Sequence, residues 1–244
     1  MKKVIMLTGG GDLPGEVVNN LKLKKIQFFC ICFDKNPVSK IIHKNNFKVI
    51  NFGRVISELK VLKTQGFNSI LMVGDIKRPN LKEIKADINS IKLIPKFTKI
   101  LFQGGDNNLL SFVIKHLSEL GFKILDLRKV IPENFLGLGN QTKFKASKVN
   151  INDINKGKLI LDSISKFDIG QSIIVQQGNV IGIEATSGTD DLIKRTNSSI
   201  KDNEKPTLIK LAKKGQNLKA DLPTIGIKTV KNCKRFSING IAYS

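Results

Sequence analysis

A short stretch between Lys210 and Val230 holds the residues best suited to chemistry, because cations and amides there precede a lone carboxylate, Asp221. The cations and amides are Lys210, Lys213, Lys214, Gln216, Asn217 and Lys219. Nearby cations favour the ionised form of a carboxylate, which suits a hard metal ion or a general base acting near phosphate. The alternative interpretation is a surface loop whose aspartate only precedes the turn at Pro223.

A second group of carboxylates is informative because Asp and Glu are scarce, at 20 against 41 cations. Glu184 ends an expected strand, and Asp190 with Asp191 begins an expected helix, so the pattern allows them to meet in one pocket. Magnesium needs only one or two protein carboxylates besides substrate phosphates. We therefore expect Asp221, Glu184 and Asp190 as magnesium ligands, and phosphoryl chemistry over proton chemistry on carbon. Asp190 has the alternative role of a helix cap.

Two loops in the first half are candidate anion contacts. Gly9–Gly11 and Asp12 follow an expected strand and precede a helix, where backbone amides can approach a phosphate group. Lys77 and Arg78 follow the expected strand Ser69–Val73, at the end where open α/β sheets bind ligands. A tight strand-to-helix turn and an ordinary basic loop are the respective alternatives.

The formal net charge of +21 over 244 residues is the largest compositional signal. It indicates nucleic acid, an anionic membrane or a phosphorylated substrate as partner. The lysines are scattered, only 6% of residues are aromatic, and no helix-turn-helix or finger pattern occurs. We therefore expect no nucleic acid as partner.

Other classes of site are disfavoured by residue counts and spacing. His43 and His116 have no partner at metal-ligand spacing, so zinc and Ser/His chemistry are not expected. Cys30, Cys32 and Cys233 form an odd set that indicates a reducing cytoplasm. No apolar run approaches the roughly 20 residues that span a bilayer.

The elements that must position these residues alternate through the first half, which predicts an α/β domain with a parallel sheet over residues 1–131. The expected strands are Val4–Leu7, Phe28–Phe33, Phe47–Phe52, Ser69–Val73 and Lys123–Leu127. The expected helices are Gly15–Lys24, Arg54–Gln65 and Asn108–Leu120. Leu81–Leu101 has a mixed pattern that Pro95 interrupts.

The alternation stops near Pro132, so we expect a linker over 132–150 and a smaller, mixed α/β domain over 151–244. Its expected helices are Asn152–Phe167 and one that has Thr189 or Asp190 as its N-cap and runs through Arg195. Its expected strands are Ser172–Gln176 and Val180–Ala185, joined as a hairpin, then Thr207–Leu211, Thr224–Ile227 and one that begins at Gly240.

An ordered set of segments over nearly the whole chain resembles the LpxI family. In the first half these are Gly9–Pro14, Gly74–Pro79 and Gly104–Leu110. In the second half they are Asp168–Gln171, Ile183–Ala185 with Gly188–Asp190, and Lys210–Gly226 around Asp221-Leu222-Pro223-Thr224.

The resemblance implies a magnesium-dependent enzyme of lipid A biosynthesis, with a Rossmann-like amino-terminal domain. It would hydrolyse the pyrophosphate bond of UDP-2,3-diacylglucosamine to UMP and 2,3-diacylglucosamine 1-phosphate (lipid X). We expect it in the cytoplasm, associated peripherally with the inner face of the cytoplasmic membrane. A homodimer is left open.

The resemblance also implies roles for individual residues, above all an essential one for Asp221. We expect Lys210, Lys213 and Gln216 to join it in catalysis by binding phosphate oxygens. The expected substrate-binding residues are Gly9, Gly10, Gly11, Asp12, Lys77, Arg78, Gly105, Asp106, Gln171, Thr189 and Thr224.

Two departures from the family pattern are visible. Ser187 stands where an acidic residue is expected before Gly-Thr-Asp, which weakens a metal role for that loop. The family usually continues for some tens of residues beyond the position of Ser244, so we expect either that the chain is truncated there or that the last strand-helix unit is missing. The competing hypothesis is a protein that binds a nucleotide or an anionic lipid without turning it over; it would be indifferent to magnesium and to loss of Asp221.

Overall fold

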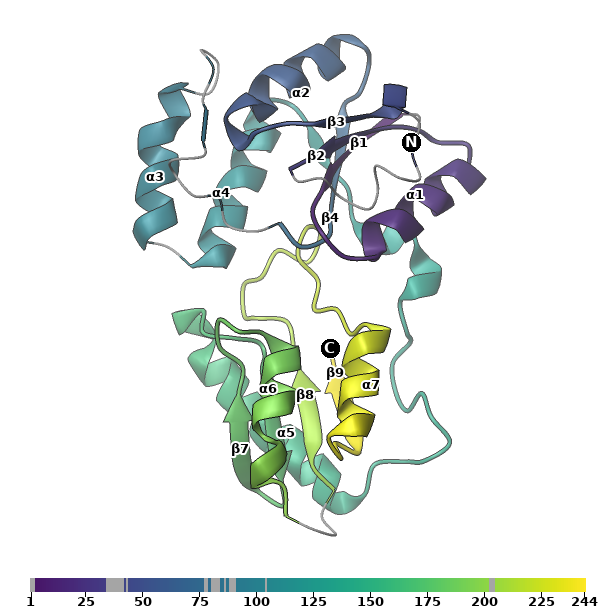
Figure 1. Ribbon diagram of the computed structural model, residues 1–244, viewed down its shortest axis with the longest axis vertical. Coiled ribbons are helices and arrows are strands. Elements are labelled where there is room, and N and C mark those ends of the chain that lie inside the picture. Colours follow the sequence, from purple (N-terminus) through teal and green to yellow (C-terminus); the bar gives the residue numbers. More distant parts are fainter. Residues whose placement is uncertain are drawn as a thin grey trace. The chain divides into compact units, whose positions relative to one another are not determined.

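The computed structural model contains two compact α/β units (Figure 1). It describes residues 3–33, 42, 44–76, 79, 84–85, 87, 91–103, 105–201 and 205–244. One unit comprises residues 1–135 together with 217–221, and the other comprises 136–216 together with 222–244. The first has a parallel sheet and the second a separate mixed sheet, so the expected fold class is confirmed.

The amino-terminal unit is built on five parallel strands in the order β3-β2-β1-β4-β5. They are β1 (Lys3–Thr8), β2 (Gln27–Cys32), β3 (Phe47–Val49), β4 (Ser69–Val73) and β5 (Lys123–Ile124). This order is that of doubly wound nucleotide-binding sheets, in which the carboxyl ends of the strands face ligands.

The described residues of this unit form four α-helices. Because side chains alternate along a strand, each face of the sheet presents a different set of apolar side chains to them. The helices are α1 (Leu13–Leu23), α2 (Val55–Thr64), α3 (Ile94–Gln103) and α4 (Asp106–Glu119). Ile5 and Leu7 of β1 join a core with residues of α2 and α4. Pro95 does not break α3, because it lies in the first turn, where no helical N–H is lost.

Two strands are shorter than expected because side-chain oxygens start a turn after each. Asn51 accepts a hydrogen bond from the Gly53 amide at 3.0 Å, so β3 ends at Val49. Asp126 likewise accepts from the Arg128 amide at 3.0 Å, so β5 is limited to Lys123–Ile124. Asn and Asp favour such turns because they bond to the backbone two residues on.

The carboxy-terminal unit has a four-stranded sheet in the order β7-β6-β8-β9. Its strands are β6 (Ser172–Gln176), β7 (Asn179–Ile183), β8 (Thr207–Lys210) and β9 (Gly240–Tyr243). The β6–β7 hairpin is confirmed, and β9 confirms the strand expected at Gly240. The fully buried Asp153 carboxylate accepts the amides of Gln177 and Gly178 at 3.0 and 2.6 Å, which fixes the hairpin turn.

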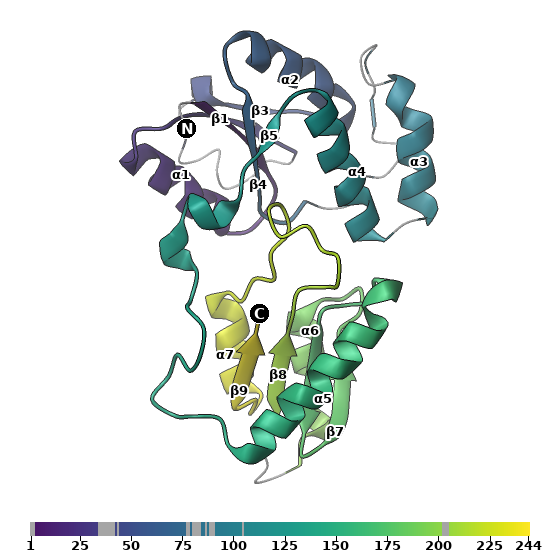
Figure 2. The same cartoon turned by 180° about the vertical axis from the view of Figure 1, so that it is seen from behind.

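Three helices cover the two faces of this sheet (Figure 2). They are α5 (Lys148–Ile164), α6 (Thr189–Arg195) and α7 (Ile227–Arg235). Ile173 and Ile209 pack with α5, whereas their neighbours Ile174 and Leu208 pack with α6 and α7. No helix among the described residues is long and apolar enough to cross a membrane.

The boundaries of these helices correct three expectations. The strand predicted at Thr224–Ile227 is wrong, because residues 221–226 are irregular and Ile227 begins α7, which buries Thr229 and Cys233 at helical spacing. Helix α5 begins at Lys148, since Ser147 and Asn150 form a reciprocal capping box. Gly188 is the residue before α6, in a left-handed conformation with φ of 84°, so neither Thr189 nor Asp190 caps the helix.

Candidate functional site

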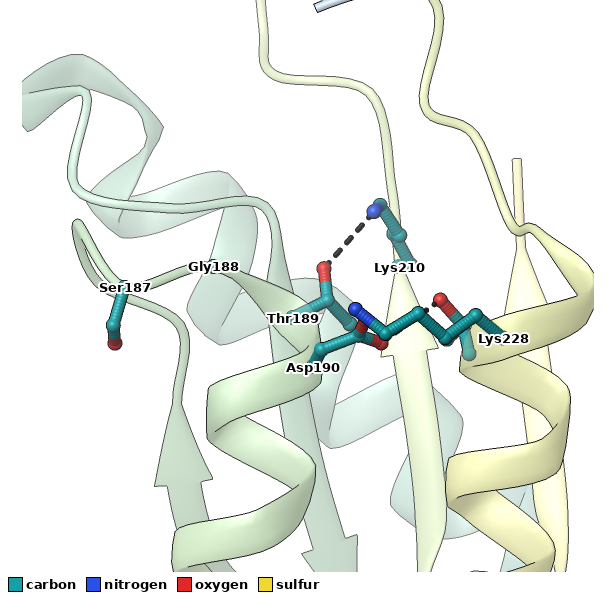
Figure 3. Close-up of a pocket in the computed structure, with 7 residues that line it drawn as sticks. Ser187, Gly188, Thr189, Asp190, Lys210 and Lys228 are labelled. Carbon is teal, nitrogen blue, oxygen red and sulfur yellow. Dashed lines mark hydrogen bonds and ion pairs between the residues drawn. The ribbon is translucent and has the colours of Figure 1, made fainter. Parts of the chain in front are cut away.

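An open pocket of about 370 Å³ lies in the carboxy-terminal unit, where β8 ends and α6 begins (Figure 3). It is lined by Ser187, Gly188, Thr189, Asp190, Lys210, Lys228 and Thr229. The residues come from the loop before α6, the last position of β8 and the first turn of α7. The site is therefore assembled from segments that are far apart in the sequence.

Three buried polar side chains form a chain that starts at the wall of the pocket and continues behind it. The Lys210 ammonium donates to Thr189 Oγ1 at 2.9 Å, and Thr189 Oγ1 lies 3.2 Å from Ser172 Oγ. Lys210 and Thr189 are each 8% exposed and Ser172 is fully buried. The buried Lys210 ammonium thus lies beside a hydroxyl in the lining of the pocket, where it can donate a charge-assisted hydrogen bond to an anionic ligand.

Asp190 links α6 to α7 at the other side of the pocket. Its carboxylate accepts from Lys228 Nζ at 3.0 Å and from Thr229 Oγ1 at 3.2 Å. Burial opposes ionisation of this carboxyl, but hydrogen bonds from α7, led by that of Lys228, outweigh burial. The pKa of Asp190 therefore lies below its ordinary value.

The charges that line the pocket sum to a positive value, since Lys210 and Lys228 face one carboxylate, Asp190. Lys228 is largely exposed, whereas Lys210 is buried. This arrangement suits a ligand with several anionic oxygens, because an exposed and a buried cation can contact different oxygens.

Glu184 and Gln171 lie together beside the pocket and not in its lining. Glu184 Oε2 accepts from the Gln171 amide at 3.4 Å, and the Glu184 amide donates to the Ser172 carbonyl at 2.8 Å. Gly170 permits this packing, since a Cβ there would lie 2.3 Å from the Glu184 carbonyl oxygen. The structure thus places the expected metal ligand Glu184 against backbone that supports Ser172.

Lys213 and Gln216 are engaged within the loop that follows β8. The Lys213 ammonium pairs with Asp168, and both side chains are largely buried. Gln216 Oε1 accepts from the Lys213 amide at 2.7 Å, and the Gln216 amide donates to the Lys213 carbonyl at 3.0 Å. These contacts shape the loop, and neither residue lines the pocket with Lys210.

Asp221 falls in the segment 217–221, which belongs to the amino-terminal unit. Ala220 of this segment packs on the core of that unit, and the Asp221 amide donates to the Asn217 carbonyl at 3.0 Å. The side chain of Asp221 is partly buried. Thr224 is exposed, and its hydroxyl donates to the Leu222 carbonyl at 3.0 Å.

The glycines after β1 have a structural role in the amino-terminal unit. The Gly9 amide donates to the Val73 carbonyl, and Gly10 exchanges two backbone hydrogen bonds with Asp75 at 2.8 and 3.1 Å. A Cβ on Gly9 would lie 2.2 Å from the Asp75 carbonyl oxygen. The Gly9 and Gly10 amides are thus committed to β4 and the turn after it, while the space around a Cβ on Gly11 is open.

The remaining expected contacts are placed only in part. Asp12 precedes α1 without a side-chain cap, and Gly105 precedes α4. Asp106 is the first residue of α4, but its side chain is not among those that the structure describes. Lys77 and Arg78 lie outside the described residues.

The carboxylates do not form a metal cage within the described ranges, where no three or more His, Cys, Asp or Glu side chains gather to hold an ion. Asp190 is already bonded to Lys228. Such a donor set fits only a metal that takes most of its ligands from substrate and water, which is the habit of Mg²⁺.

Ser172, Lys228 and Thr229 were not singled out by the sequence. Ser172 gave one available signal, as a polar residue directly before the apolar run of a buried strand. Lys228 resembles the many other surface lysines until α7 brings it to Asp190. Its role depends on helix packing, which residue spacing does not reveal.

Comparison with known proteins matches both halves of the chain. Residues 3–134 match the LpxI N-terminal domain, and residues 137–244 match the LpxI C-terminal domain. A relative from Caulobacter vibrioides, named UDP-2,3-diacylglucosamine pyrophosphatase LpxI, is 27% identical over 255 residues. That match covers 99% of this chain and 88% of the relative. The chain belongs to the LpxI family.

Proposed function

We propose that this protein hydrolyses the pyrophosphate bond of UDP-2,3-diacylglucosamine, releasing UMP and 2,3-diacylglucosamine 1-phosphate in lipid A biosynthesis. The observation that carries the proposal is the Lys210 pocket, where a buried ammonium donates to the Thr189 hydroxyl in a chain of the LpxI family. The relative's name supplies the substrate. The diphosphate of this substrate provides the anionic oxygens that the pocket suits.

Electrostatic stabilisation is the main chemical contribution of the pocket. Lys210 is fixed by Thr189 and binds a phosphate oxygen, where it offsets the charge that develops as the bond to the leaving group breaks. Lys228 contacts a second oxygen from the rim. The assigned role of Asp221 is to orient or deprotonate the attacking water.

Magnesium is part of the proposal and arrives chiefly with the substrate phosphates. When bound, it neutralises charge on the diphosphate. Asp221 is the first protein ligand to test. Glu184 and Asp190 rank below it, because Glu184 contacts the Gln171 backbone and Asp190 is held by Lys228.

Peripheral contact with the inner face of the cytoplasmic membrane is proposed for the segment 136–147, which is exposed throughout. Leu138 is fully exposed and Phe144 is 85% exposed, and Lys143 and Lys145 flank Phe144. Apolar side chains among cations favour an anionic bilayer surface. Sedimentation with phosphatidylglycerol vesicles tests this, and a Leu138→Ser/Phe144→Ser variant should remain in the supernatant.

The test of the function is UMP release from UDP-2,3-diacylglucosamine by purified protein, with magnesium and with chelator. Wild type should turn over only with magnesium, and Asp221→Ala should be inactive while it keeps its circular dichroism and melting temperature. Near-normal turnover by that variant would remove Asp221 from the mechanism. No turnover by a folded wild type would favour a protein that binds nucleotide or anionic lipid only.

A further inference from the structure

We propose that Ser172 is a positioning residue, which acts through Thr189 to aim a hydroxyl and the Lys210 ammonium at an anionic ligand. The inference rests on the proposed function and deepens it, because it says how the phosphate-binding groups are held. Ser172 does not line the pocket, and its hydroxyl is behind that of Thr189.

The register of the sheet puts the three residues together. Ser172 of β6 is the partner of Lys210 on β8, and Ile174 is the partner of Leu208. Ile174 and Leu208 pack against α6, so alternation by two places Ser172 and Lys210 on the same face. Thr189 is the first residue of α6 and meets both there, as Figure 3 shows for Lys210.

The number of protons fixes what each group can donate. An ammonium only donates, so Thr189 Oγ1 must accept from Lys210. Thr189 has one proton and can either give it to Ser172 or accept a second bond from Ser172. In the second arrangement the Thr189 proton is available to the pocket.

An anionic ligand selects the second arrangement. Phosphate oxygens accept hydrogen bonds and give none when fully ionised, so they draw the Thr189 proton toward the pocket. Ser172 then donates to Thr189 from behind. Because Ser172 is fully buried, and its carbonyl accepts the Glu184 amide at 2.8 Å, this donor is held in place before a ligand arrives.

Three substitutions separate the hydroxyl groups from side-chain shape. Thr189→Val keeps the shape and removes the hydroxyl, Thr189→Ser keeps the hydroxyl, and Ser172→Ala removes only the supporting donor. Thr207→Val is the matched control, because Thr207 is also a buried hydroxyl of this sheet and bonds to Asn150 at 3.1 Å. It lies at the opposite end of β8 from Lys210.

Two readouts keep this inference distinct from the proposed function. One is kcat/KM for UDP-2,3-diacylglucosamine, and the other is calorimetric binding of inorganic pyrophosphate, which needs no turnover. Thr189→Val should lose roughly 10- to 100-fold in both, the effect of a hydrogen bond to a charged group. Ser172→Ala should lose about threefold to tenfold. Thr207→Val should stay within about threefold of wild type, and Thr189→Ser should lose less in both readouts than Thr189→Val.

The deciding comparison is the double variant Ser172→Ala/Thr189→Val. If Ser172 acts through Thr189, the double variant is no worse than Thr189→Val alone, because the supporting bond has already gone. A loss equal to the product of the single losses, or a Ser172→Ala protein equal to wild type in both readouts, overturns the inference. If wild type binds pyrophosphate with this pattern but hydrolyses nothing, the proposed function fails and the positioning role stands.

Discussion

Substitution of Gly9 by alanine should destabilise the amino-terminal unit strongly, because backbone atoms fill the space that a side chain needs. The new Cβ would lie 2.2 Å from the Asp75 carbonyl oxygen and 2.4 Å from its carbonyl carbon. To relieve this overlap, the turn after β4 must move, which breaks the two Gly10–Asp75 hydrogen bonds. Their loss costs about 1–3 kcal/mol. Overpacking adds about 1–3 kcal/mol, so the expected loss is about 2–6 kcal/mol.

The assay is urea unfolding combined with hydrogen exchange, and Gly11→Ala is the control. Amides of β1 and β4 should lose protection in Gly9→Ala while those of β6 keep it. Nothing lies within 4 Å of a Cβ on Gly11, whose φ of +89° alone costs about 1–2 kcal/mol with a side chain. A Gly9→Ala protein as stable as wild type, or less affected than Gly11→Ala, would refute the reasoning. A raised KM in Gly11→Ala would support the phosphate contact expected there.

Three further outcomes follow from buried groups. Asp153→Ala should lower the free energy of unfolding in urea by about 2–5 kcal/mol, because two hairpin amides lose their acceptor; a loss under 1 kcal/mol would contradict this. Asp190 has a lowered pKa, so it stabilises the fold above about pH 4 and loses that effect as pH falls through the lowered pKa. The difference in melting temperature between wild type and Asp190→Asn should therefore become smaller in acid. A difference that grows in acid would contradict the lowered pKa of Asp190. Burial, with a smaller effect of the Asp190 charge, raises the pKa of the Cys233 thiol to about 11. At pH 8 this thiol should therefore react with a thiol reagent only when the protein unfolds. Rapid labelling of Cys233 in the native protein would argue against its burial.

The strands of the first half were predictable because their apolar runs are continuous and bounded by turn residues. Val4–Leu7 is buried on both faces, as such a run requires in a parallel sheet. The same signal failed at Thr224–Ile227, where a short apolar run suggested a strand. There the buried residues Thr229 and Cys233 are four apart, as on one face of a helix. This helical pattern outweighs the β propensity of the segment, and α7 forms instead.

The residues of the candidate site were largely predictable from the sequence, but which of them contact one another was predictable only in part. Lys210, Thr189 and Asp190 were all expected, but their meeting depends on the order β7-β6-β8-β9, which spacing does not specify. Lys213 was expected as a phosphate ligand, and the structure shows its ammonium on Asp168. Asp168 adopts a left-handed backbone conformation with φ of 54°. No local sequence pattern predicts this conformation.

The most direct test of the central claim measures kcat/KM for UDP-2,3-diacylglucosamine in Lys210→Met beside Lys231→Met. Lys231 is an exposed cation of α7 that does not line the pocket, so it controls for net charge. The pocket assignment predicts a loss of at least about 100-fold for Lys210→Met, the order expected when a charged transition-state contact is removed. It predicts near-normal activity for Lys231→Met. Equal activities of the two variants, with both folded, would contradict the assignment of catalysis to this pocket.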